Sequence, residues 1–118
     1  MKKVMFVDDE ALLALGAEAS LQAEGFEVAI AFDGEEALSK VADFAPDIIL
    51  TDLMMPKLDG VSLAKALGDQ GSTIPVVVLT AVPEADLPTE ARSLFAAYLG
   101  KPLRDETMVS CISALVGR

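Results

Sequence analysis

Short apolar runs alternate along this chain with longer segments in which apolar residues recur at helical spacing. Apolar runs that stop at polar residues predict strands buried on both faces, and a period near 3.6 predicts amphipathic helices. The predicted strands are Val4–Val7, 26–30, Ile48–Leu50, Pro75–Leu79 and Tyr98–Leu99. This alternation predicts an α/β fold with a parallel sheet covered by helices on both faces.

The first predicted helix spans residues 11–24 and ends at Gly25, a residue type that favours helix ends. The side chains expected to face the sheet are Leu12, Leu15, Ala19 and Ala23. Asp33 and Glu36 resemble a capping box at the start of a second helix. The apolar face of that helix is expected to comprise Ala37, Leu38, Val41 and Phe44.

Asp59 is expected to cap a third helix that runs from Gly60 to about Gly68, with Leu63 and Leu67 inward. Residues 83–96 are the least regular part, because Pro83 and Pro88 limit any helix there to a short one that begins near Pro88. The last helix is predicted from a stripe of Met108, Cys111, Ile112 and Leu115.

Length and charge limit the function of the chain. Its 118 residues fit one domain, and its net charge of −10 disfavours direct binding to nucleic acid. No apolar run approaches the roughly 20 residues that span a bilayer, so no membrane association is expected. A single cysteine, Cys111, forms no internal disulfide and fits a cytoplasmic, reducing compartment. The absence of histidine rules out histidine-based catalysis, histidine metal ligands and a phosphohistidine within this chain.

Five polar residues stand where predicted strands end: Asp8, Asp9, Asp52, Thr80 and Lys101. The carboxyl ends of parallel strands line one crevice, so these residues are expected to form a single site. In a flavodoxin-like strand order, Asp9 and Asp52 would be neighbours, and two carboxylates about 4 Å apart repel by about 4 kcal/mol at an effective dielectric near 20. A divalent cation relieves that repulsion. A few carboxylates completed by water favour Mg²⁺, with Mn²⁺ as the alternative.

Four motifs resemble the receiver domain of two-component response regulators. They are V-D-D-E at 7–10, T-D-L-M-M-P-K-L-D-G at 51–60, L-T-A at 79–81 and Y-L-G-K-P at 98–102. The resemblance runs the whole length, so residues 1–118 are expected to form one receiver domain. It implies a flavodoxin-like (βα)5 doubly wound parallel sheet with strand order 2-1-3-4-5.

The resemblance also implies roles for the strand-end residues. Asp52 would accept a phosphoryl group from a phosphohistidine on a sensor histidine kinase or a histidine phosphotransfer protein. Mg²⁺ would bind Asp9 and Asp52 directly, Asp8 through water, and the backbone carbonyl of Met54. Lys101 would pair with a phosphoryl oxygen.

The resemblance implies that a second group of residues aligns the phosphoryl group and transmits the signal. Pro102 resembles the family's cis-proline after the lysine, and Ala81 is small enough to leave the phosphoryl group access to Asp52. Thr80 and Tyr98 resemble the switch pair that alters the face formed by helix four, strand five and helix five.

Two departures from the family pattern affect output and lifetime. Residues 94–97 read Leu-Phe-Ala-Ala where the family usually has a Gly-Ala pair, so the partner of that face is not read by analogy. Met54 and Val82 occupy the two positions that flank the phosphoryl group, and neither side chain hydrogen-bonds water. This predicts a long-lived aspartyl phosphate.

Alternative functions remain open at this point. A receiver that binds a partner without phosphorylation is one, although the complete set of strand-end residues argues against it. A Mg²⁺-dependent phosphohydrolase with an Asp nucleophile is disfavoured, because Met54 stands where such enzymes often carry an acid. No enzymatic activity is expected beyond the chain's own phosphorylation and dephosphorylation. The Met1-Lys2-Lys3 start favours a stand-alone regulator over a receiver segment of a longer regulator or hybrid kinase.

Overall fold

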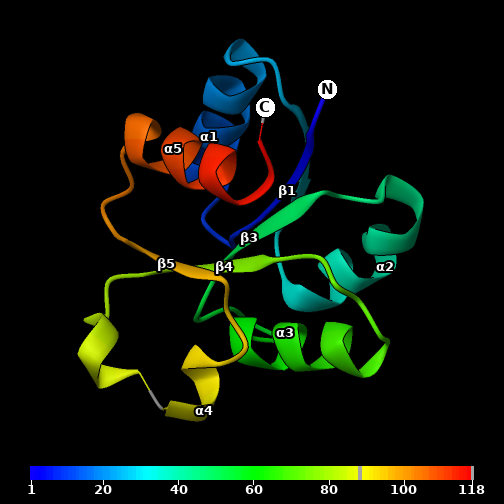
Figure 1. Ribbon diagram of the computed structural model, residues 1–118, viewed down its shortest axis with the longest axis vertical. Helices are drawn as coiled ribbons and strands as arrows, with labels where there is room; N and C mark the ends of the chain where they lie inside the picture. Colours follow the sequence, from blue (N-terminus) through cyan, green and yellow to red (C-terminus); the bar gives the residue numbers. More distant parts are fainter. Residues whose placement is uncertain (88, 118) are drawn as a thin grey trace.

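Five parallel strands form one sheet in the order β2-β1-β3-β4-β5 (Figure 1). The computed structural model describes residues 1–87 and 89–117. The strands are β1 (Lys3–Val7), β2 (Glu27–Ala31), β3 (Ile48–Asp52), β4 (Val76–Thr80) and β5 (Ala97–Gly100). The predicted flavodoxin-like fold and strand order are therefore confirmed.

Helices cover both faces of the sheet (Figure 1). α1 (Ala11–Ala23) and α5 (Asp105–Val116) pack on one face, and α2 (Gly34–Phe44) and α3 (Gly60–Asp69) pack on the other. Among the described residues, none of the helices has the length and apolar character needed to cross a membrane.

The core consists of two layers separated by the sheet. Along β1, Val4 and Phe6 face α1 and α5, whereas Met5 and Val7 face α2 and α3. Successive side chains of a strand point to opposite faces, and here both faces are buried. This arrangement explains why the strands read as continuous apolar runs instead of alternating ones.

The predicted inward face of α1 is wrong. Leu12 is 88% exposed and Leu15 is 51% exposed, and Ala19 and Ala23 are also exposed. The residues that contact the sheet are Ala14, Ala17 and Leu21. Two apolar stripes interleave along this helix. The stripe of Ala14, Ala17 and Leu21 faces inward, where the two small alanines permit close approach to the strands. The stripe that begins with Leu12 and Leu15 lies at the surface.

The other helix predictions hold with smaller corrections. In α5, Met108 and Ile112 are buried and Cys111 is half-buried, but Leu115 is 38% exposed, and Val116 packs against the core instead. Leu63 and Leu67 of α3 are buried as predicted. The predicted face of α2 packs into the core through Ala37, Leu38, Val41 and Phe44.

The predicted helix ends are also largely confirmed. The Asp33 carboxylate accepts a hydrogen bond from the Glu36 N–H at 2.8 Å, and the Asp59 carboxylate accepts one from the Ser62 N–H at 2.8 Å. The Glu36 side chain reaches the N–H of Phe32 instead of closing a box on Asp33. Gly25 follows α1 with a positive φ of 91°, which glycine adopts without strain.

The segment before β5 contains little helix, as predicted. It holds a 3₁₀ turn, η1 (Glu84–Asp86), and a four-residue helix, α4 (Thr89–Arg92). Pro88, where this helix was expected to begin, lies outside the described residues. Leu94 and Phe95 then pack against the core layer under α3.

Candidate functional site

The register of the strands places the predicted site residues along one edge of the sheet. Val7 pairs with Thr51, so Asp8 comes level with Asp52. Asp52 pairs with Leu79, and Thr80 pairs with Gly100 immediately before Lys101. Asp52 and Thr80 are the last residues of their strands instead of following them, which extends the predicted strand ends.

Three carboxylates meet at this edge. Asp8, Asp9 and Asp52 each present an oxygen, and the three oxygens lie within 4.8 Å of one another. Asp8 is fully buried and Asp52 is 8% exposed, whereas Asp9 lies at the surface. This set of hard oxygen donors, one of them open to solvent, fits a Mg²⁺ ion that keeps several of its waters.

Lys101 supplies positive charge inside this cluster. Its Nζ lies 3.1 Å from Asp8 Oδ2 and 3.3 Å from Asp52 Oδ1. The second oxygen of Asp8 accepts a hydrogen bond from the Glu10 N–H at 2.9 Å, so both Asp8 oxygens are engaged. The peptide bond between Lys101 and Pro102 is cis, as the resemblance implied.

The charges in the cluster are not balanced by the protein alone. Burial and the neighbouring Asp8 carboxylate raise the pKa of Asp52 above its ordinary value, and Lys101 offsets only part of that rise. The sequence predicted that Asp9 would repel Asp52, but the buried Asp8 is the carboxylate that shifts its pKa. The repulsion from Asp8 is the part of this rise that a bound cation would relieve.

Glu10 is a nearby acid that sequence reasoning did not assign. Its carboxylate lies 3.6 Å from Lys101 Nζ, and its side chain is largely exposed. In the sequence, only its place in the run of three acids at 8–10 indicated that Glu10 belongs near the cluster. Its contact with Lys101 depends on where α1 begins, which the sequence pattern alone does not fix.

Thr80 and Tyr98 meet on the same residue. The Thr80 Oγ1 accepts a hydrogen bond from the Val82 N–H at 3.0 Å, and the Tyr98 hydroxyl donates to the carbonyl oxygen of Val82. Thr80 is buried and Tyr98 is half-buried. Ala81, between Thr80 and Val82, is exposed at the carboxyl edge. The side chains of Thr80 and Tyr98 are therefore both bonded to the backbone of Val82.

The loop after Asp52 carries Met54 and turns back toward α3. Its base is closed by a 3.0 Å hydrogen bond from the Gly60 N–H to the carbonyl oxygen of Leu53. A Cβ at Gly60 would come within 2.5 Å of the carbonyl oxygen of Asp52, so only glycine permits this approach. The Met54 side chain on this loop is exposed.

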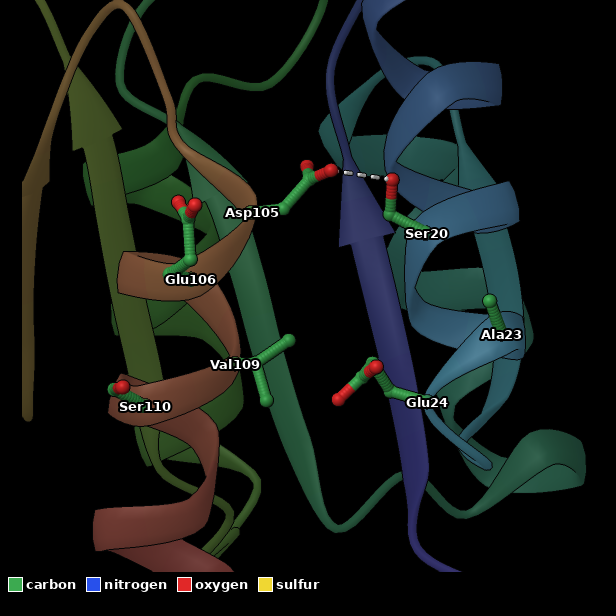
Figure 2. A pocket seen from close by; sticks show the side chains of 7 residues that line it. All are labelled: Ser20, Ala23, Glu24, Asp105, Glu106, Val109 and Ser110. Carbon is green, nitrogen blue, oxygen red and sulfur yellow. Dashed lines mark hydrogen bonds between the residues drawn. The ribbon is translucent and has the colours of Figure 1, made fainter.

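A groove of about 460 Å³ lies elsewhere, between α1 and α5 (Figure 2). One hydrogen bond of 3.0 Å crosses it, from the Ser20 hydroxyl to the Asp105 carboxylate. The described residues that line it include the acids Glu24, Asp105 and Glu106 but no basic side chain and none of the strand-end residues. The carboxylate cluster, which combines acids with a half-buried ammonium, is therefore the stronger candidate site.

Comparisons with known proteins agree with this fold. A family model described as the response regulator receiver domain matches residues 4–113. The alkaline phosphatase synthesis transcriptional regulatory protein PhoP of Bacillus subtilis is 36% identical over 99% of this chain and 49% of its own length. The transcriptional regulatory protein PrrA of Mycobacterium tuberculosis is 38% identical over 98% of this chain and 50% of its own length. The chain spans about half the length of these curated relatives.

Solved structures show the same architecture over their whole length. The receiver domain of the Francisella response regulator 1452 superimposes with a TM-score of 0.91 and 32% identity, covering 98% of this chain and 97% of that one. The chemotaxis protein CheY4 of Vibrio cholerae gives a TM-score of 0.91 with 30% identity and covers 98% of both chains.

Proposed function

Because this chain belongs to the response regulator receiver domain family, we propose that it accepts a phosphoryl group on Asp52. The donor would be a phosphohistidine of a sensor histidine kinase or of a histidine phosphotransfer protein, since this chain contains no histidine. One observation carries the proposal. Asp52 ends β3 within an oxygen cluster and 3.3 Å from the Lys101 ammonium.

The chemistry follows from this arrangement. An Asp52 oxygen forms a bond to phosphorus while the phosphorus–nitrogen bond of the donor breaks, and the imidazole leaves to be protonated by solvent. Asp9, Asp52 and the Met54 carbonyl would hold a Mg²⁺ ion, with Asp8 acting through water, and the ion would supply positive charge to neutralise the phosphoryl oxygens. Lys101 adds a fixed positive charge and aligns the group. Engagement of both Asp8 oxygens supports the indirect role of that residue.

The signalling step would use the residues that meet at Val82. The Thr80 hydroxyl would move to donate a hydrogen bond to the new phosphoryl group, and this movement would break the bond in which its Oγ1 accepts from the Val82 N–H. Because the Tyr98 hydroxyl is bonded to the carbonyl of the same residue, the packing around β5 would change as well. We therefore propose a phosphorylation switch in the cytoplasm whose output is protein contact, without direct binding to nucleic acid or membrane.

The test is intact mass after incubation with acetyl phosphate, with Mg²⁺ and with a chelator. We expect one added phosphoryl group with Mg²⁺ and none with the chelator. Mn²⁺ should replace Mg²⁺. No addition, together with no spectral change on adding beryllofluoride, would favour the receiver that acts without phosphorylation. Steady release of phosphate from a phosphomonoester would favour the hydrolase.

The exposed leucine stripe of α1 suggests where the donor protein docks. α1 begins directly after the acidic run, so Leu12 stands beside the site and is almost fully exposed. We expect Leu12→Asp to slow transfer from a donor protein by about tenfold, the cost of a moderate interface residue. Transfer from acetyl phosphate should not change. The matched control is Leu115→Asp on α5, which should affect neither reaction, and a loss with both donors in Leu12→Asp would contradict the docking role.

The apolar flanks predict a slow loss of the phosphoryl group. Both Met54 and Val82 have exposed side chains at the carboxyl edge, and neither positions an attacking water. Replacing both with polar residues, Met54→Asn with Val82→Glu, should speed dephosphorylation by about tenfold or more, since a positioned general base contributes about 10²-fold. The measurement is the decay of phosphorylated protein by intact mass. An unchanged decay rate would contradict the role of these flanks.

A further inference from the structure

The loop after Asp52 is fastened to the turn that precedes α2. The Gly34 N–H donates to the carbonyl oxygen of Leu58 at 3.1 Å. Beside it, the Lys57 ammonium lies 3.7 Å from the Asp33 carboxylate. Gly34 is the first residue of α2, so its N–H has no partner within the helix and Leu58 satisfies it. The loop that carries Met54 is thus held to α2 at its far end as well as closed at its base.

This contact leaves no room for a side chain on Gly34. A Cβ there would lie 2.3 Å from the carbonyl oxygen of Leu58 and 2.7 Å from its Cβ. The Leu58 side chain packs into the core layer formed by α2 and α3. The atoms that face Gly34 are the backbone and the Cβ of Leu58, whose side chain is packed in the core. A substituent at Gly34 therefore displaces the loop, because neither group can rotate away.

The loop between Leu58 and Met54 has little freedom to absorb such a displacement. Pro56 fixes one φ angle, and Lys57 already holds a left-handed φ of 67°. Met55 packs against the same core layer as Leu58. A shift imposed at Leu58 is therefore passed along the backbone to Met54.

We infer that Gly34 is a positioning residue for the Mg²⁺ site, acting through Leu58 on the backbone carbonyl of Met54. This inference rests on the proposed function, in which that carbonyl is a metal ligand. It assigns a role in metal binding to a residue on the neighbouring β2–α2 turn, which contributes no ligand of its own. Supporting contacts of this kind change metal affinity about 10- to 100-fold when they are altered.

The test compares Gly34→Ala with two other glycine-to-alanine variants. A Cβ at Gly16 in α1 or at Gly68 in α3 would meet no atom within 4 Å, and neither residue has a positive φ, so alanine fits at both. The measurements are the Kd for Mg²⁺ by titration calorimetry on unphosphorylated protein and the Tm of each variant. We expect Gly34→Ala to raise the Kd by about tenfold or more, with the Gly16→Ala and Gly68→Ala values unchanged from the parent chain.

The outcomes separate this inference from the proposed function. A lower Tm for Gly34→Ala with an unchanged Kd would overturn the inference and leave the function standing. If Gly34→Ala does not fold, Lys57→Gly removes the pair with Asp33 while suiting the left-handed φ. A raised Kd there supports the inference, and an unchanged one overturns it. If the parent chain neither binds Mg²⁺ nor takes up a phosphoryl group, the proposed function fails, and the inference with it.

Discussion

Replacing Asp52 with asparagine is expected to abolish phosphoryl uptake while making the folded chain more stable. The amide keeps the size of the side chain but loses the nucleophilic oxygen, so acetyl phosphate with Mg²⁺ should add no mass. The gain in stability has a separate cause. Asp52 is buried beside Asp8, and asparagine removes the repulsion between two carboxylates that share one ammonium.

The stability difference should depend on pH. Because the pKa of Asp52 is raised in the folded chain, the folded state holds its proton more tightly than the unfolded state does. The proton bound to Asp52 therefore stabilises the folded chain fully below the ordinary aspartate pKa, and this stabilisation is lost as the pH rises through the raised pKa. An asparagine side chain does not titrate. We expect the advantage of Asp52→Asn over the parent chain to be present near pH 7 and small near pH 4, the region of the ordinary pKa.

Denaturant unfolding at both pH values measures this difference, and intact mass measures the uptake. Asp69→Asn is the matched control. Asp69 is an exposed acid at the C-terminal end of α3, whereas Asp52 lies beside Gly60 at the N-terminal end of that helix. The Asp69→Asn variant should take up phosphoryl like the parent chain. Uptake that persists in Asp52→Asn would place the acceptor on another carboxylate, with Asp8 and Asp9 the nearest ones.

The position of the site could be predicted from the sequence because it depends on a rule of topology. Polar residues that end parallel strands lie at one edge whatever the details of packing, and Asp8, Asp52 and Lys101 are indeed in contact there. Caps were predictable for a similar reason, since Asp33 and Asp59 act within four residues of their own position.

Features that depend on distant contacts could not be predicted in this way. The 11–24 segment contains two apolar stripes at helical spacing, and only the fit of Ala14 and Ala17 to the sheet decides which one is buried. Nothing near Gly34 in the sequence indicates that the carbonyl of Leu58 approaches it. The meeting of Thr80 and Tyr98 on Val82 likewise depends on the path of residues 83–96, which have little regular pattern in the sequence.

Removing the ammonium of Lys101 should impair both stability and phosphoryl uptake. Lys101→Met keeps most of the side-chain volume but leaves the fully buried Asp8 without a cation. We expect a loss of about 3 kcal/mol in the free energy of unfolding at neutral pH, the usual cost of breaking a buried ion pair. Uptake from acetyl phosphate should fall about 100-fold, the effect of losing one fixed group that stabilises developing charge.

The dependence on pH and Mg²⁺ separates this electrostatic loss from a simple packing defect. Burial alone would lower the pKa of Lys101, but its contacts with Asp8 and Asp52 raise it above its ordinary value. While these carboxylates are ionised, its contribution to stability is therefore complete below the ordinary lysine pKa and is lost as the pH rises through the raised one.

Mg²⁺ should restore part of the stability of Lys101→Met, because the ion neutralises the same carboxylates, and should have a smaller effect on the parent chain. The measurement is denaturant unfolding with and without Mg²⁺, and Lys65→Met, at an exposed position of α3, is the control. A destabilisation of Lys101→Met that Mg²⁺ leaves unchanged would mean that Lys101 acts through packing. In that case the carboxylates at this edge would not depend on an added positive charge. The metal site presupposes that they do, so this result would also count against it.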